Sequence, residues 1–456
     1  MRSVATPVLP VTRDATATSA ATRLSGWGRS PVVEGHERIG EDLERLTRDV
    51  SLTRGLGRSY GDSSLPAKGG GTIASTRLAD RILAFDPETG VLRAEAGLSL
   101  FALNRALLDR GWFTPVSPGT QFVTLGGMVA SDVHGKNHHE AGTFGRHVSR
   151  LLLRAGSGDI VETGPDVERE LFDATVGGMG LTGHILEVEV RLKRVNSPWI
   201  WSESETAPDF ETLAERLVDA GRSWPYTVAW ADLLHSSGRG ILVKGRWSEP
   251  GEAPTTKFTW PGAVAIPFDM PGWAINPLSM RMFNALYLAK HGRRTRTGIA
   301  HPQSFFYPLD AILDWNRAYG SRGFTQYQCV IPKESGVAAA AKFARLVRET
   351  GGLPCLVVVK DFGPEGPGVL SFPKPGITLA IDLPVTDVTP GLVARLNDVV
   401  AAEGGRVYLT KDAFTSREHF RAMEPRLAAF DDVRRRWDPD RKIRSAQSVR
   451  LLGDNE

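Results

Sequence analysis

The sequence predicts an α+β fold with two domains, and three observations support this prediction. The chain has 456 residues, more than an ordinary single domain holds. Short stretches of strand character alternate with glycine clusters up to about residue 195, and strands alternate with helices beyond it. The composition, with 48 Gly and 29 Pro, is that of a loop-rich enzyme and argues against a helical array.

Composition also excludes several classes of protein. The 55 basic and 52 acidic residues leave a net charge of +3, which is too small to argue for nucleic-acid binding. The two cysteines, Cys329 and Cys355, cannot form a disulfide framework and are predicted to be buried thiols. The first thirty residues lack the apolar core of a secretory signal, and no stretch reaches the roughly 18 apolar residues of a membrane helix. We therefore expect a protein that is soluble or peripheral at a membrane.

Changes of pattern predict the domain boundaries. Residues 1–22 are polar and without periodicity, which indicates a disordered leader. Residues 23–196 form a first, glycine-rich domain, in which 185–192 alternates as a half-buried antiparallel strand does. Residues 197–414 form a second domain, with an antiparallel sheet covered by helices on one face. Residues 415–456 are amphipathic and rich in Arg, and we expect them to return to the first domain.

The first glycine-rich loop, TRGLGRSYGD over residues 53–62, is suited to binding a phosphate. Its spacing is GxGxxxG, one residue longer than the dinucleotide fingerprint, and the residues after it lack the apolar period of a phosphate-binding helix. A nicotinamide-binding domain is therefore not expected. Glycines nevertheless let consecutive backbone N–H groups converge on one anion. A simple turn between two strands explains this loop equally well when it is taken alone.

Two further glycine-rich loops follow in the same domain. Residues 118–137 contain the pair Gly126-Gly127 before small residues, which lets the backbone approach a flat ligand closely. Residues 174–183, ATVGGMGLTG, end a predicted helix and lead into the alternating strand. Three such loops in one domain favour a ligand site over three unrelated turns.

The order of these motifs resembles the FAD-binding domain of the vanillyl-alcohol-oxidase type of flavoprotein. The likeness rests on RGLGRSYGD, on PGT followed by HGKNHH, and on ATVGGMGLTG. It continues through WNRAYG (315–320), GFTQYQ (323–328), KDFGP (360–364) and Lys411-Asp412, and so covers nearly the whole chain after about residue 22. The resemblance implies a two-domain fold of the PCMH/VAO type, with residues 23–196 binding FAD and 197–414 binding the substrate.

The resemblance also implies which residues contact FAD. They are Thr53, Arg54, Gly55, Leu56, Gly57, Arg58, Ser59, Tyr60, Gly61, Asp62, Ser63, Gly119, Thr124, Leu125, Gly126, Gly127, Ser131, Asp132, Val133, His134, Ile185 and Tyr408. Many relatives bond a histidine of the first loop to the flavin 8α-methyl group, but here that position is Arg58. Because no cysteine lies in the N-terminal half either, we expect FAD to be held without a covalent bond.

For catalysis the resemblance implies Lys411, Tyr60, His134 and Gln328. The residues implied in substrate binding are Lys136, Gln326, Gln328, Lys360 and Ala380. A flavin takes hydride from an alcohol while a protein group accepts or orients the hydroxyl proton. Burial would favour a neutral, proton-accepting Lys411, but a charged Lys411 that anchors the substrate or flavin is an equal alternative.

Two details of the site residues bear on its chemistry. Mycobacterial relatives carry a cysteine where this chain has Ala380, so a covalent inhibitor that needs that thiol would lose its anchor. His134, His138 and His139 have no carboxylate or thiol at ligand spacing, so no metal is expected.

The apolar stretch 258–289 leaves two alternatives open. Its prolines, from Pro261 to Pro277, rule out one continuous helix across them. It is either core of the second domain or a mobile apolar flap for a polyprenyl chain. The basic cluster 290–296 either meets a lipid phosphate or is ordinary solvated loop charge.

Within the family, the nearest resemblance is to members that oxidise the ribose 2′-hydroxyl of a polyprenyl-phosphoryl ribose to the keto sugar. In those members an NADH-dependent reductase completes the epimerisation, which supplies the arabinose donor of actinobacterial cell walls, and a periplasmic location is compatible with this. An oxygen-using sugar, alditol or aldonolactone oxidase is the alternative enzyme. A flavin- or lipid-sugar-binding carrier is disfavoured, because Lys411 and the paired glutamines would then have no task.

Overall fold

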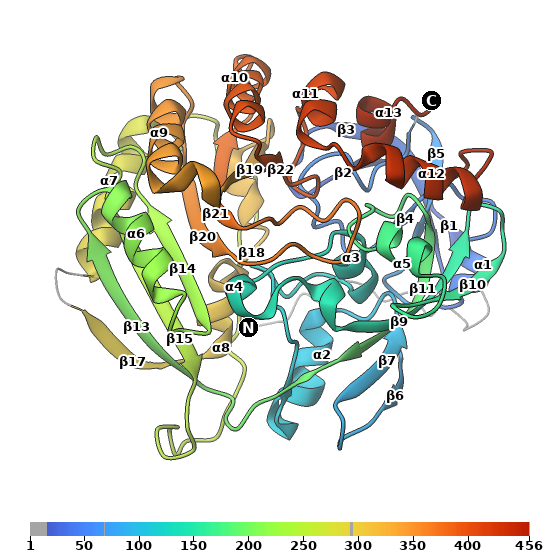
Figure 1. Ribbon diagram of the computed structural model, residues 1–456, viewed down its shortest axis with the longest axis horizontal. Helices are drawn as coiled ribbons and strands as arrows, with labels where there is room; N and C mark the ends of the chain where they lie inside the picture. The colour runs from blue at the N-terminus through green and yellow to red at the C-terminus, as the bar shows by residue number, and fades with distance from the viewer. Residues whose placement is uncertain (1–15, 68, 292–294, 456) are drawn as a thin grey trace.

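The computed structural model describes residues 16–67, 69–291 and 295–455, which form a first region up to about residue 195 and a second region after it (Figure 1). The first region contains two five-stranded sheets. One has the order β1-β3-β5-β4 with β2 paired to β3, and in it β3, β5 and β4 run parallel. The other has the order β10-β9-β11-β7-β6 and is antiparallel throughout.

The elements of the first region are short. Its strands are β1 (Ala17–Thr18), β2 (Thr22–Ser25), β3 (Val32–Ile39), β4 (Thr53–Arg54), β5 (Gly71–Ser75), β6 (Ile82–Phe85), β7 (Val91–Glu95), β9 (Val148–Ala155), β10 (Ile160–Thr163) and β11 (Gly183–Arg191), with the pair β8 (Trp112–Phe113) and β12 (Lys193–Arg194) beside them. Its helices are α1 (Leu43–Leu46), α2 (Leu100–Leu107), α3 (Leu125–Ala130), α4 (His138–Ala141) and α5 (Arg169–Thr175).

Strand β11 lies in the middle of the antiparallel sheet, which confirms the strand predicted over residues 185–192. Val188 and Val190 are fully buried in the core of the first region. Glu187 directly precedes Val188, on the opposite face, and pairs with Arg93 and Arg150 at 2.8 and 3.2 Å. The alternation of the sequence thus separates a hydrophobic face from a charged one.

The second region is built on one eight-stranded antiparallel sheet, as predicted. Its order is β17-β13-β15-β14-β20-β21-β19-β22. The strands are β13 (Ile200–Ala207), β14 (Tyr226–Ala231), β15 (Gly240–Trp247), β17 (Arg296–Ala300), β19 (Phe324–Pro332), β20 (Leu356–Phe362), β21 (Gly376–Pro384) and β22 (Arg406–Val407). Helices α6 (Phe210–Ala220), α9 (Gly336–Glu349) and α10 (Thr389–Ala402) cover one face (Figure 1).

The other elements of this region lie outside that layer of helices. They are α7 (Pro277–His291), α8 (Pro302–Phe306) and the two-residue strands β16 (Val264–Ala265) and β18 (Ile312–Leu313). Helix α7 begins at the last of the four prolines, so no helix crosses them, as predicted. Of the helices in the described part of the chain, none is long and apolar enough to cross a membrane.

Strands β19 and β21 present different residues to the two faces of this sheet. They pair antiparallel, with Gln326 opposite Asp382 and Gln328 opposite Ala380. The residues between these positions, Tyr327, Cys329, Leu379 and Ile381, are buried in the core beneath the helices. Because successive side chains of a strand point to opposite faces, the glutamines, Ala380 and Asp382 share the other face.

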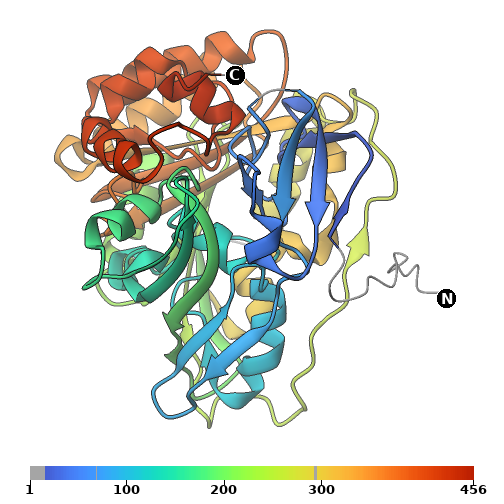
Figure 2. The same cartoon turned by 90° about the vertical axis from the view of Figure 1, so that its right-hand side faces the viewer.

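The C-terminal segment packs against the first region (Figure 2). It forms α11 (Arg417–Met423), α12 (Leu427–Trp437) and α13 (Ala446–Leu452). Phe430 is fully buried in the core of the first region, and the buried Arg434 donates to the Leu181 carbonyl at 3.1 Å. Arg450 forms ion pairs with Asp62 and Asp412 at 2.8 and 2.9 Å.

The prediction that residues 1–22 form a disordered leader is wrong for residues 17–22. Ala17–Thr18 pairs with β3, and β2 begins at Thr22. The Glu37 backbone N–H donates to the Ser19 hydroxyl at 3.0 Å. Polar residues can form such edge strands because backbone hydrogen bonds hold them in place without a buried side chain. Residues 1–15 lie outside the described residues.

We expect Arg450→Met to lower the free energy of unfolding by about 3 kcal/mol, because it leaves two largely buried carboxylates without their shared cation. Urea titration followed by circular dichroism measures the loss. Arg435→Met is the matched control, since its ion pairs with Asp431 and Asp432 are exposed and should contribute less than about 1 kcal/mol. Equal losses in the two variants would contradict the expectation.

Candidate active site

A cavity of about 680 Å³ lies between the two regions and is lined by residues from both. Most of the residues that the sequence predicted for the site line this cavity. The predicted cofactor contacts among them are Thr53, Gly55, Leu56, Gly57, Arg58, Ser59, Tyr60, Ser63, Gly119, Thr124, Gly126, Gly127, Ser131, Val133, His134, Ile185 and Tyr408. Lys136, Gln326, Gln328, Lys360, Ala380 and Lys411 also line it.

The glycine-rich loops form a wall of bare backbone in this cavity. A Cβ atom on Gly55 would lie 2.5 Å from the Thr124 hydroxyl, and one on Gly126 would lie 2.9 Å from the Ala96 methyl group. Gly57 has a φ of +65°, a conformation that residues with side chains rarely adopt. Thr124 caps α3 by accepting from the Gly127 N–H at 3.2 Å. Any ligand here therefore meets backbone N–H groups at close range.

Four buried polar atoms of residues that line the cavity have no hydrogen-bond partner among the described residues. They are the hydroxyls of Ser63 and Thr76, the Nε of Arg58 and the Nδ1 of His134. Buried donors are rarely left unpaired, because each costs about 1–3 kcal/mol. They fit a polar ligand that supplies acceptors in this part of the cavity.

Arg58 packs on an aromatic ring that the sequence did not point to. Its guanidinium carbon lies 3.8 Å from the centre of the Trp27 ring, a cation–π contact. Burial lowers the pKa of Arg58, while Asp310 and Asp314 raise it. Trp27 also lines the cavity, although it precedes the first glycine-rich loop by many residues.

Five predicted cofactor contacts do not line the cavity: Arg54, Gly61, Asp62, Leu125 and Asp132. Arg54 donates to the Ser25 carbonyl and the Ser64 hydroxyl, and Asp62 is held by Arg450. Leu125 is fully buried in the hydrophobic core. Local sequence could not distinguish these residues from their neighbours, because side chains leave a loop in several directions.

The other two of the five serve packing between loops. Asp132 is fully buried and accepts from the Gly145 N–H at 2.9 Å and from the Ser371 hydroxyl. Burial raises the pKa of Asp132 to about 6, although these hydrogen bonds lower it. A Cβ atom on Gly61 would lie 1.9 Å from the Asp412 carbonyl oxygen, so only glycine lets the two loops touch. Both residues therefore shape the site without facing the ligand.

His134 and Gln328 meet at the wall of the cavity. The Gln328 amide donates to His134 Nε2 at 3.0 Å and to the Thr378 hydroxyl at 3.2 Å. Burial, together with the charges of Lys360 and Lys411, holds the pKa of His134 well below its usual value. His134 is therefore neutral and accepts through Nε2, which leaves its proton on Nδ1.

Lys411 lies over the ring of Tyr60, with its Nζ 3.7 Å from the ring centre. Burial lowers the pKa of Lys411 to about 7, assisted by the charge of Lys360 and opposed by Asp382. A lysine in this environment changes its charge near neutral pH. Burial also raises the pKa of Tyr60 well above its usual value, so its phenol stays protonated.

Asp382 is a site residue that the sequence analysis missed. It is fully buried and accepts hydrogen bonds from the Gln326 amide at 2.5 Å and from the Tyr319 hydroxyl at 3.3 Å. Burial raises its pKa to about 6, although the Gln326 hydrogen bond and the charge of Lys411 lower it. Its position two residues after Ala380 on β21 was the available signal, because such residues share a face.

Lys136 and Lys360 add two further cations to the same cavity. Burial lowers the pKa of Lys136 to about 7 and that of Lys360 to about 8. Lys136 donates to the Phe306 carbonyl at 3.1 Å and lies over the Phe305 ring. The cavity therefore contains several amines whose charged form an anionic ligand would stabilise.

Neighbouring groups complete the wall. Tyr408 donates to the Ser131 carbonyl at 2.9 Å and stacks on Phe372. His184, also missed from the sequence, hydrogen-bonds to the Thr53 hydroxyl and so joins the third glycine-rich loop to the first. These contacts hold the loops in register before any ligand binds.

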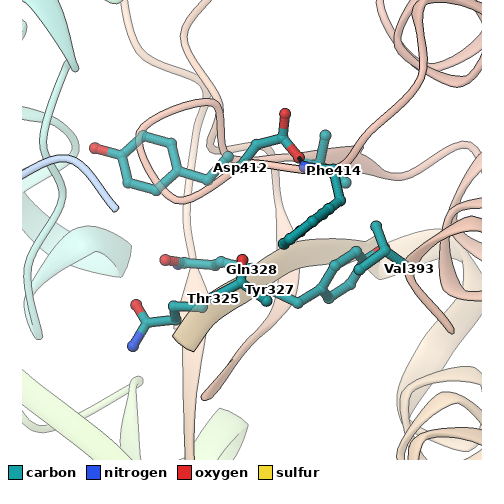
Figure 3. A pocket seen from close by; sticks show the side chains of 9 residues that line it. Thr325, Tyr327, Gln328, Val393, Asp412 and Phe414 are labelled. Atoms are coloured by element: carbon teal, nitrogen blue, oxygen red, sulfur yellow. Dashed lines mark hydrogen bonds between the residues drawn. The ribbon is translucent and has the colours of Figure 1, made fainter. Parts of the chain in front are cut away.

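A second, much smaller pocket adjoins β19 (Figure 3). It has a volume of about 10 Å³ and lies beside Tyr327, Val393 and Phe414. Figure 3 shows the side chains of Gln328 and Tyr327 leaving β19 in different directions. This pocket holds one water molecule at most and is not a second ligand site.

The three neighbouring histidines have other contacts. His138 accepts from the Gly363 N–H at 3.1 Å, and His139 donates to the Trp224 carbonyl at 2.8 Å. Within residues 16–67, 69–291 and 295–455, no group of three or more His, Cys, Asp or Glu side chains is arranged to hold a metal ion.

The stretch 258–289 is not the core of the second region. Trp273 and Leu278 are 77% and 79% exposed, and several other large apolar side chains around them are exposed as well. Part of the stretch also borders the cavity, because Tyr287 and the half-exposed Phe283 line it. Residues 292–294 of the basic cluster lie outside the described residues.

Comparison with known proteins agrees with this geometry. A family model described as an FAD binding domain matches residues 47–164. The chain is 34% identical to decaprenylphosphoryl-β-D-ribose oxidase of Mycolicibacterium smegmatis, over 94% of this chain and 97% of that protein. It is 33% identical to an uncharacterised protein of Streptomyces coelicolor, over 78% of this chain and all of that protein. L-gulonolactone oxidase of Scyliorhinus torazame is 26% identical over 34% of this chain.

The cavity fits FAD on the evidence of its own residues. The bare glycine backbone admits a flat ring system and a pyrophosphate, and the unpaired groups of Arg58, Ser63 and Thr76 offer it hydrogen bonds. The volume of about 680 Å³ lies within the usual range for cofactor sites. The residues that would hold FAD are those of the three glycine-rich loops.

We expect the flavin to leave the protein on denaturation, because Arg58 offers no nucleophile at the position of the tethering histidine. Precipitation with trichloroacetic acid should place the yellow colour in the supernatant, where its absorbance spectrum is measured. Yellow colour in the pellet after washing would contradict this expectation. A flavoprotein with histidine-linked FAD, treated in parallel, is the control that keeps its colour in the pellet.

Proposed function

The chain belongs to the vanillyl-alcohol-oxidase family of FAD-dependent oxidoreductases, and on this basis we propose that it oxidises the ribose 2′-hydroxyl of decaprenylphosphoryl-β-D-ribose to a ketone. The hydroxyl loses its proton and the carbon loses a hydride, a two-electron oxidation for which bound FAD would be the hydride acceptor. A separate NADH-dependent reductase then reduces the keto sugar to the arabinose epimer. FAD is held without a covalent bond.

The observation that carries this proposal is the set of three half-buried lysines in one cavity. Lys136, Lys360 and Lys411 all line it, and burial lowers the pKa of each. Amines brought out of water in this way are stabilised by an anionic partner. A phosphodiester beside the sugar supplies that negative charge, whereas a free alditol or a neutral lactone does not.

The residues around Lys411 suit proton transfer. FAD, when bound, accepts the hydride from the alcohol carbon. Lys411 in its neutral form accepts the hydroxyl proton, and Asp382 stabilises the ammonium ion that results. Tyr60 lies against Lys411 and keeps water from its flank.

The glutamines of β19 position the sugar. Gln326 is held by Asp382, and Gln328 is held by Thr378 and His134, so neither amide is free to rotate. Both line the cavity on the same face of the sheet as Ala380. Fixed amides of this kind supply hydrogen bonds to hydroxyl groups without an ordering cost at the moment of binding.

Anaerobic mixing with decaprenylphosphoryl ribose should bleach the oxidised flavin absorbance, and Lys411→Met should slow the bleaching roughly a hundred- to ten-thousandfold. Stopped-flow absorbance near the flavin maximum measures the rate. Lys442→Met is the matched control, since this lysine is 59% exposed and pairs with the exposed Asp440, and it should keep the wild-type rate.

Two results would overturn the proposal. The first is bleaching by a free alditol or aldonolactone but not by the lipid-linked ribose, which would indicate an oxygen-using sugar oxidase. The second is bound flavin that no sugar can bleach, which would indicate a carrier protein.

The rate of flavin reduction should rise with pH and level off above about 7, because Lys411 accepts a proton only when it is neutral. Asp382 raises the pKa of Lys411, so Asp382→Asn should move the midpoint to lower pH by about one unit. Asp398→Asn, which removes an exposed carboxylate paired with His419, should leave the midpoint where it is. A rate that falls as the pH rises would show instead that Lys411 acts as a charged anchor.

A further inference from the structure

Helix α7 turns apolar side chains toward solvent. Of its fifteen residues only Asn284 is buried, and that residue donates to Asp232 at 2.8 Å. Leu278, Met282 and Leu286 recur at a spacing of four residues and are 63–79% exposed. A helix at the surface of a water-soluble protein normally has the opposite arrangement, with its apolar stripe against the core.

The exposed apolar surface extends beyond the helix. Val264, Phe268 and Trp273 precede it and are 58–77% exposed. Together with Leu278, Met282, Phe283 and Leu286 they form what we call the α7 face. An exposed group of large apolar side chains of this size marks an interaction site rather than ordinary surface.

The charges around the α7 face have one predominant sign. Among the described residues between 257 and 296, the basic ones are Lys257, Arg281, Lys290 and Arg296. The single acidic residue there, Asp269, forms ion pairs with Arg29 and Arg317 at 2.8 and 3.0 Å. The surroundings therefore favour an anionic partner.

The same helix forms part of the cavity wall. Phe283, Tyr287 and His291 line the cavity, and Tyr287 packs edge-on against Trp230 with their ring centres 4.9 Å apart. Val228 and Trp230 of β14 line it too, while Ala229 and Ala231 face the helix-covered core. Helix α7 thus lies on the cavity side of the sheet, at the outer margin of the second region (Figure 1).

We propose that the α7 face docks on an anionic phospholipid membrane, with its apolar side chains among the acyl chains and its basic residues at the headgroups. The choice of a membrane rests on the proposed function, because a cavity of about 680 Å³ that also holds FAD has no room for a decaprenyl chain. Docking at the mouth of the cavity leaves most of that chain in the bilayer. The phosphoryl ribose alone then enters between Lys136, Lys360 and Lys411.

The physical character of the face agrees with this occupant. Helices that lie in the membrane interface combine an apolar face with flanking Lys and Arg, and they bind more strongly to anionic lipids. Each basic residue near such a surface raises the affinity about fivefold at physiological ionic strength. A second copy of the chain is a poorer fit, because two α7 faces would bring their basic residues together.

Sedimentation with vesicles tests the proposal on the full-length holoprotein. Vesicles of phosphatidylcholine and phosphatidylglycerol in equal amounts should carry the protein into the pellet, and pure phosphatidylcholine vesicles should do so much less. The triple variant Leu278→Glu, Met282→Glu, Leu286→Glu should lower the partition coefficient at least about tenfold. Its oxidised flavin absorbance reports that it has folded.

The matched control places three glutamates on exposed apolar residues elsewhere. Ile160→Glu, Val167→Glu, Val388→Glu changes the net charge equally, at side chains that are 40–63% exposed and remote from α7 in the fold. This control should bind the anionic vesicles as the wild type does. An equal loss of vesicle binding in the two triple variants would mean that net charge alone determines the binding, and this would overturn the proposal.

Two other outcomes would also overturn it. One is wild-type protein that does not sediment with anionic vesicles. The other is a wild-type dimer that the α7 variant converts to monomer, which would mean that a second copy covers the face. Bleaching by a short-chain polyprenyl-phosphoryl ribose, added from solution without vesicles, tests the proposed function separately. Vesicle binding without such bleaching refutes the function and not the docking surface.

Discussion

Strands β19 and β21 have a hydrophobic core on one side and the cavity on the other, and the site depends on this alternation. Their odd-numbered residues hold the sheet to its helices through Tyr327, Cys329, Leu379 and Ile381. Their even-numbered residues supply the paired glutamines, Ala380 and Asp382 to the opposite face. A slip of one residue in the register of either strand would bury polar groups in the core and empty the site.

The electrostatics of the cavity follow from this arrangement. Three lysines and His134 line the same cavity, and burial lowers the pKa of each. Asp382 opposes this effect at Lys411, because a carboxylate raises the pKa of a nearby amine. The fold tolerates this because a lysine can become neutral where a fixed charge could not. The proposed function uses this property, since it assigns the role of proton acceptor to Lys411 and an anionic ligand to the three amines.

Helix α7 likewise has two different sides, one on the cavity and one on the solvent. Asn284 and Tyr287 attach it to the sheet, and Phe283 and Tyr287 close one side of the cavity. Its exposed residues include the apolar Leu278, Met282 and Leu286. Helix α7 therefore reaches from the cavity wall to the surface of the molecule, as the proposed docking of a lipid-linked sugar requires.

The sequence by itself determined the features that depend on local spacing. Residues close together in the chain predicted the glycine loops at 53–62, 118–137 and 174–183, the alternating strand before Leu192 and the helices of the second region. Most of the predicted site residues line one cavity. Only the tertiary structure brought Asp382 and Tyr319 to Lys411 and Tyr60. It also placed the Trp27 ring against the Arg58 guanidinium. Arg54 and Asp62 point away from the cavity because they pair with other parts of the chain. The tertiary structure also decided that the apolar residues of 264–286 face outward. These outcomes depend on strand register and on contacts between distant segments, about which the period of a single segment carries no information.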